Sequence, residues 1–135
     1  MDQMFSKFQP IALSLFRFMI GLLLFQYGVA KILKFPVLPN FANPPPLIMT
    51  AGGIELVLGA LLMIGLFSRI VALILSGEMA FAYFLGHMFK NPAQPLWHPL
   101  QNGGTAAILF CFACLYLATS GGGPISVDAA MGKKS

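Results

Sequence analysis

The sequence carries little charge. Of its 135 residues only 9% are Asp, Glu, Lys or Arg, whereas 58% are hydrophobic, and the mean hydropathy is +0.82. A soluble domain usually carries about 25% charged residues, so this chain lacks the polar side chains needed to cover a surface in water. The shortage of charge excludes an ordinary soluble domain, and the thirteen phenylalanines exclude intrinsic disorder.

Other absences narrow the class further. The two cysteines, Cys111 and Cys114, lie inside an apolar run and are too few for a disulfide scaffold. The eight basic residues give a net charge of +4 but are scattered singly, so they form no stripe that would bind nucleic acid. The sequence contains no Rossmann fingerprint, P-loop or catalytic triad, and it therefore identifies no catalytic residue. What remains is an integral membrane protein, and we expect the lipid bilayer to be one of its partners.

Four apolar stretches are present, at about 11–32, 47–67, 70–88 and 104–119. A helix needs about 20 apolar residues to cross a hydrocarbon core about 30 Å thick. The pattern predicts one all-α transmembrane domain over residues 1–135, a four-helix bundle embedded in the membrane. Proline-rich segments predict loops after the first and third helices, and Phe67-Ser68-Arg69 predicts a tight turn that makes the second and third helices an antiparallel hairpin.

The basic residues predict the orientation of this bundle. With four spans both termini share one side, which collects Lys7, Arg69, Lys133 and Lys134, against Lys31, Lys34 and Lys90 on the other. The positive-inside rule places the side with more Lys and Arg in the cytoplasm. We therefore expect both termini to be cytoplasmic.

Three ionisable residues fall within the apolar stretches: Arg17, Glu55 and Glu78. A charge near the bilayer centre costs at least ~2.5–3.5 kcal/mol, so such residues usually face the protein interior and find partners. At about 1.5 Å per residue, Arg17 lies about 9 Å, Glu78 about 12 Å and Glu55 about 18 Å from the cytoplasmic edge. The depths predict a hydrogen-bonded Arg17–Glu78 pair, with Glu55 about one turn farther out.

Small residues accompany each of these charges. Helical spacing defines three faces, which hold Arg17, Gly21, Leu24, Gly28 and Lys31; Gly52, Glu55 and Gly59; and Glu78, Ala82 and Gly86. Small residues let membrane helices approach closely. Two roles remain open for the charges: a structural lock between helices, or a site in which the unmatched carboxylate accepts protons and Tyr83 donates them.

The cysteines and histidines predict neither a thiol redox site nor a metal site. Cys111 and Cys114 form a C-x-x-C, but a thiolate is poorly solvated at the middle of an apolar helix, which favours packing residues over thiol redox chemistry. His87 and His98 have no third ligand at a suitable spacing, so no metal site is predicted. The glycine run at 121–123 is expected to end the fourth helix, with Ser126 capping a short segment that carries Asp128.

The sequence resembles the DoxX family of small bacterial membrane proteins. The residues that carry the resemblance are Arg17, Gly21, Gly28, Lys31-Ile32, Gly65-Leu66-Phe67-Ser68-Arg69, Ser76-Gly77-Glu78-Met79-Ala80-Phe81-Ala82-Tyr83-Phe84 with His87, Asn102-Gly103-Gly104, Cys111-Phe112, Leu115-Tyr116-Leu117-Ala118, Gly121-Gly122-Gly123-Pro124 and Ser126-Val127-Asp128. The resemblance implies a four-helix, multi-pass protein of the bacterial inner membrane. Some members are linked with quinone-dependent sulfur oxidation, and others with membrane complexes that handle oxidative or thiol stress. Members commonly carry a glutamate where this chain has Thr105, so no family catalytic residue is transferred.

Three functions are compatible with these observations. The first, which we favour, is an accessory subunit of a membrane oxidoreductase system that binds a quinone and receives electrons from a redox partner protein. The second is a carrier or channel for a proton or small solute, which would need a homo-oligomer because four helices enclose only a narrow path. The third is an assembly scaffold without chemistry. In the first, Arg17, Glu78, Glu55 and Tyr83 would contact the quinone or move protons, and the chain would not be a self-sufficient enzyme.

Overall fold

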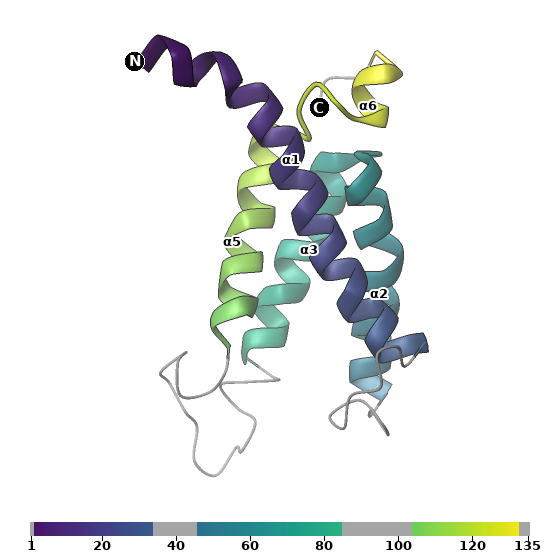
Figure 1. Cartoon of the computed structure of the whole chain (residues 1–135). Coiled ribbons are helices and arrows are strands. Elements are labelled where there is room, and N and C mark those ends of the chain that lie inside the picture. Colours follow the sequence, from purple (N-terminus) through teal and green to yellow (C-terminus); the bar gives the residue numbers. More distant parts are fainter. Residues whose placement is uncertain (1, 34–45, 85–103, 133–135) are drawn as a thin grey trace.

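The computed structural model describes residues 2–33, 46–84 and 104–132, and the regular elements in these ranges are all helices (Figure 1). They are α1 (Asp2–Gly28), continued by the π-helical turn η1 (Val29–Leu33), α2 (Pro46–Ile64), α3 (Ser68–Phe81), α5 (Thr105–Ser120) and the short α6 (Val127–Ala130). The all-α prediction is confirmed for this part of the chain. Both predicted proline-rich loops, together with His87 and His98, lie outside the described residues.

The long helices pack in pairs. α1 lies along α2, α3 lies along α5, and α2 and α3 form the predicted antiparallel hairpin (Figure 1). Leu24, Leu62, Leu75 and Leu117, one from each long helix, are fully buried in the common core. The start of α1 and the short α6 lie at the same end of the molecule (Figure 1). We call this the terminal end.

Two helix boundaries differ from those predicted. α1 begins at Asp2, not near residue 11, because a hydropathy pattern locates an apolar stretch and not the helix that contains it. α2 ends at Ile64, because Gly65 has a φ of +76° and leaves the helical conformation there. Phe67 has a φ of +55°, so the turn is completed before α3 begins at Ser68.

The outer faces of the long helices are apolar. Leu15, Val57, Ile70 and Leu109, one on each long helix, are 60%, 59%, 65% and 66% exposed. Monomeric soluble proteins rarely expose contiguous apolar surface on this scale. Within the described residues, the helical segment Gln3–Leu33 is long and apolar enough to cross a membrane, and Met49–Ile64 and Thr105–Ser120 are shorter apolar helices.

Glycines bring α1 and α2 into backbone contact. A Cβ atom at Gly21 would lie 2.6 Å from the Met63 nitrogen, and one at Gly59 would lie 2.8 Å from the Phe25 nitrogen. A Cβ at Gly28 would overlap the backbone of Leu56. These distances are shorter than any van der Waals contact, so the predicted close approach of the small-residue faces is confirmed for these two helices.

Candidate functional site

Arg17 lies at the terminal end and bonds to backbone oxygens. Its guanidinium donates hydrogen bonds to the carbonyl oxygens of Gly122 at 2.7 Å, Ile125 at 2.8 Å and Met63 at 3.2 Å. Glu78 is not among its partners, and the carboxyl group of Glu78 interacts instead with Glu55 and Lys31. The predicted Arg17–Glu78 hydrogen bond is therefore wrong.

The assumed helix boundaries explain this error. The depth calculation placed residue 11 level with the ends of the other helices, whereas α1 extends well beyond them (Figure 1). Arg17 is consequently level with the turn between α2 and α3, where it meets Met63. At about 1.5 Å per residue, Glu78 lies about 15 Å further along α3 from Ser68.

The role of Arg17 is to hold the C-terminal segment over the terminal end. In that segment the Asp128 carboxylate accepts hydrogen bonds from the backbone N–H groups of Phe67 at 2.8 Å and Ser68 at 2.9 Å. A carboxylate at the first N–H groups of a helix satisfies donors that have no partner inside the helix. Arg17 also attracts Asp128 electrostatically. The predicted cap of α6 by Ser126 is confirmed, because its hydroxyl accepts a hydrogen bond from Ala129 N at 3.1 Å.

The ion pair in the interior joins Lys31 to Glu55. The ammonium nitrogen of Lys31, in η1, lies 2.9 Å from Oε1 and 2.8 Å from Oε2 of Glu55. Glu55 is only 2% exposed and is the central residue of α2, about 14 Å from either end of that helix. Gly52 makes the pairing possible, because a Cβ there would lie 2.7 Å from Cβ of Lys31.

Glu78 brings a second carboxyl group to this pair from α3. Both of its oxygens are buried, and the group is close enough to be repelled by Glu55 and attracted by Lys31. The structure therefore brings Glu55 and Glu78 together, with Lys31 and not Arg17 as the cation. We call Lys31, Glu55 and Glu78 the polar cluster.

Lys31 was missed as a site residue although the sequence contained a signal for it. Lys31 shares a helix face with Gly21 and Gly28, and Glu55 shares one with Gly52 and Gly59. Glycine faces of this kind pack against each other in membrane proteins. Pairing the two faces, instead of comparing depths, would have placed Lys31 opposite Glu55.

The remaining candidates lie just beyond the end of α3 and on α5. Tyr83 is buried against Ala107 and Ile108 of α5, and its part in proton transfer stays a prediction. Cys114 is fully buried in the core, and the backbone oxygen of Cys111 accepts a hydrogen bond from Ser76 at 2.8 Å. Both thiols are free, and their role as packing residues stays a prediction. No group of three or more His, Cys, Asp or Glu side chains suited to a metal occurs in the described ranges.

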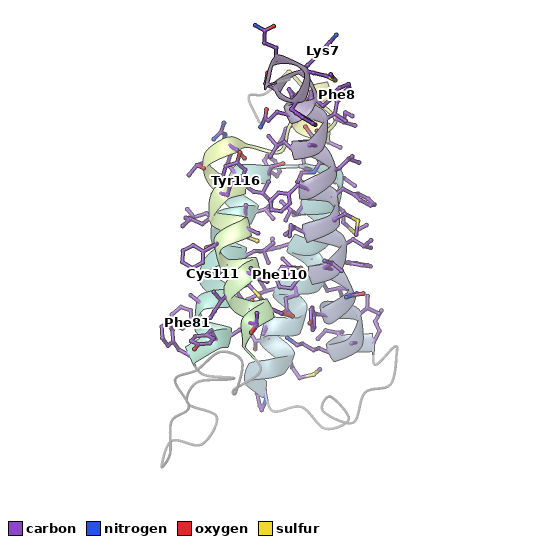
Figure 2. The ribbon with its side chains drawn as sticks, turned by 60° about the vertical axis from the view of Figure 1, so that its left-hand side comes forward. Lys7, Phe8, Phe81, Phe110, Cys111 and Tyr116 are labelled. Carbon is purple, nitrogen blue, oxygen red and sulfur yellow. The ribbon has the colours of Figure 1, made fainter. Side chains whose placement is uncertain are left out.

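An apolar groove of about 570 Å³ runs between α1 and α5. Its lining residues are Phe16, Ile20, Leu23, Ala106, Leu109, Phe110, Phe112 and Ala113. Phe110, on α5 (Figure 2), meets the Tyr27 ring of α1 edge-on at 6.2 Å between centroids. The Lys31 ammonium lies 5.8 Å from the centroid of the same Tyr27 ring. Tyr27 thus stands between the apolar groove and the polar cluster.

The family model for DoxX matches residues 12–88. The chain belongs to the DoxX family. It is also 38% identical over 132 residues to an uncharacterized protein of Haemophilus influenzae, an alignment that covers 96% of this chain and 97% of the relative. No solved structure matches the chain. The range matched by the DoxX model contains all three residues of the polar cluster.

Proposed function

We propose that this DoxX protein crosses the bacterial inner membrane four times, with both termini in the cytoplasm, and is a quinone-interacting accessory subunit of a membrane oxidoreductase system. Family membership and the outward-facing apolar side chains support the membrane assignment. Lys7 and Arg69, both at the terminal end, support a cytoplasmic position for that end through the positive-inside rule.

The polar cluster is the observation that carries the functional part of the proposal. Ionisable side chains inside a membrane protein are costly, and they usually mark a ligand site or a proton pathway. One Lys31 ammonium balances one carboxylate, so two ionised carboxylates would leave a net negative charge among apolar helices. We therefore assign one shared proton to Glu55 and Glu78.

This charge arrangement suits a quinone. Reduction to the quinol consumes two electrons, which a partner protein would supply, and two protons. The carboxyl pair would deliver the one proton that it shares, take up a second proton from the aqueous phase and deliver that one in turn. Lys31 would stabilise negative charge on the ligand oxygen. The groove between α1 and α5 would hold an apolar tail, because its lining is apolar and one lining residue, Phe110, contacts Tyr27, next to Lys31.

One observation favours a second function, a carrier of protons or small cations. The buried carboxyl group of Glu78 shares one nearby cation, Lys31, with Glu55, which suits a group that exchanges a proton or meets a passing cation. A carrier would move protons or cations across liposomes without any quinone. The accessory-subunit function needs the quinone and the partner instead.

Purification in mild detergent, followed by mass spectrometry of the extracted lipids, tests the proposal. We expect quinone to accompany the wild type and the Lys7→Gln variant, which loses an exposed lysine far from the cluster. Quinone should be lost from Lys31→Gln and reduced in Glu55→Gln. An absence of quinone from the wild type together with pH-dependent flux in liposomes would support the carrier instead. An absence of both would leave a scaffold and contradict the proposal.

A further inference from the structure

The first turns of α1 carry an unpartnered apolar stripe. Figure 2 shows Lys7 and Phe8 near the free end of α1, beyond the other helices. Met4, Phe5, Phe8 and Ile11 are 60%, 66%, 54% and 46% exposed there. At about 100° per residue, these four side chains fall within one third of the helix circumference. A strip of large apolar side chains therefore extends past the packed helices.

The stripe continues the outward face of the span. Leu15 and Met19 follow Met4, Phe8 and Ile11 at helical spacing, and both are exposed. Lipid covers this face wherever the helix crosses the membrane. Its continuation to Met4 indicates that the same environment extends to the start of the helix.

The opposite face changes character where the packed helices end. Where α1 packs against the other helices, this face carries the buried Ser14, Arg17 and Gly21. Nearer the N-terminus the same side carries Gln3, Ser6 and Lys7, all exposed and polar. The segment is thus amphipathic on its own, with Lys7 at the edge of the apolar stripe.

The helix also bends at this point. Pro10 lies inside α1 and removes one backbone hydrogen bond, and the first turns leave the direction of the span (Figure 1). Because this bent segment is attached to a span, the span holds it near the bilayer surface. Amphipathic helices with basic residues lie in the interface with their apolar face in the acyl chains.

We infer that residues 3–12 form an interfacial anchor, which lies on the membrane at the terminal end with Met4, Phe5, Phe8 and Ile11 in the lipid and Lys7 at anionic headgroups. The inference rests on the proposed membrane assignment but not on the quinone site. The lipid is identified by chemistry: an apolar stripe takes acyl chains, and a single cation at its edge takes a phosphate-bearing anionic headgroup.

Tryptophan fluorescence of the full-length protein tests the anchor. The one native tryptophan is replaced by Trp97→Phe, and Phe8→Trp is compared with the polar-face variant Ser6→Trp in phosphatidylcholine–phosphatidylglycerol vesicles. We expect blue-shifted emission and quenching by brominated lipids for Phe8→Trp. Ser6→Trp should show red-shifted emission and quenching by aqueous acrylamide. Adding Lys7→Gln should reduce the dependence of Phe8→Trp emission on phosphatidylglycerol.

A reference position separates failure of the anchor from failure of the membrane assignment. Val57→Trp lies on the outer face of α2 and should be quenched by brominated lipids if the helices span the membrane. If Val57→Trp is quenched but Phe8→Trp is open to acrylamide, the anchor is overturned. Protection of Phe8→Trp from both quenchers would also overturn it, and would indicate a protein partner or a second copy on the stripe.

Discussion

At the scale of single residues, the main feature is the ion pair of Lys31 with Glu55, which has a second carboxyl group, that of Glu78, nearby. Lys31 bonds to both oxygens of Glu55, and Glu78 lies within electrostatic range. Removing one partner of a buried pair usually costs ~3–5 kcal/mol, because the other charge is left unpaired. Here Glu78 can replace Glu55, so the two carboxyl groups are expected to compensate for each other.

This redundancy predicts a non-additive result for unfolding in mixed detergent–SDS micelles. Glu55→Gln and Glu78→Gln should each lower the free energy of unfolding by less than ~3 kcal/mol, whereas the double variant should lose ~3–5 kcal/mol because Lys31 is then unpaired. Adding Lys31→Met to the double variant should recover most of the loss. Additive losses would show that the two carboxyl groups do not share Lys31.

The Asp128 carboxylate gives a second prediction at this scale. Asp128→Ala removes the acceptor for the first N–H groups of α3, so the free energy of unfolding should fall by about 0.5–2 kcal/mol, as for other helix caps. Asp128→Asn keeps one acceptor oxygen and should lose less. Thermal unfolding in detergent measures both. Equal losses for the two variants would argue against capping as the role of Asp128.

At the scale of helices, the sequence predicts those features that depend on residue composition. The apolar character of the helices, the hairpin at residues 65–69 and the end of α5 at Gly121 followed from hydropathy and backbone preference, whereas the start of α1 at Asp2 did not. The Arg17 partners did not, because they are carbonyl oxygens of a C-terminal segment more than 100 residues away in the chain. No spacing rule connects a guanidinium to backbone oxygens at that separation. Similarly, Lys31 was counted among the basic residues on the side opposite the termini, because hydropathy alone does not reveal the opposing glycine face.

The glycine contact between α1 and α2 predicts a contrast between two glycines of the same helix. Gly59→Ala places a Cβ 2.8 Å from the Phe25 nitrogen and should cost about 1–3 kcal/mol through overpacking. Gly53→Ala meets nothing within 4 Å and should stabilise α2 by up to about 1 kcal/mol, because alanine favours helix. Equilibrium unfolding of the two variants in the same detergent measures the difference. Similar effects in both would contradict the close packing of α1 on α2.

At the scale of the whole molecule, the structure separates two kinds of charge. The terminal end holds Arg17 and Asp128 in a network that fastens the C-terminal segment. The interior holds the polar cluster, next to an apolar groove that opens between α1 and α5. In the first network, Arg17 and Asp128 bond to backbone groups, so these two charges have a structural role. The second holds two carboxyl groups beside one lysine, and it is there that we place the function.

The proposed topology makes a direct prediction. Reporter fusions placed after Ser135 should give a cytoplasmic signal, and fusions at Asn40 a periplasmic signal, because the terminal end carries Lys7 and Arg69. Alkaline phosphatase and green fluorescent protein fusions report the two sides independently. A periplasmic signal after Ser135 would invert the topology and place the interfacial segment on the outer leaflet.

The central claim, that a quinone binds at the polar cluster, is tested most directly by photoaffinity labelling. Membranes containing the protein are irradiated with an azidoquinone, and the labelled residues are identified by mass spectrometry. We expect labels on peptides that contain Tyr27, Lys31 or Phe110, abolished by excess unlabelled quinone and by Lys31→Gln but retained in Lys7→Gln. Labels confined to other surfaces, or labels that excess quinone does not displace, would contradict the claim.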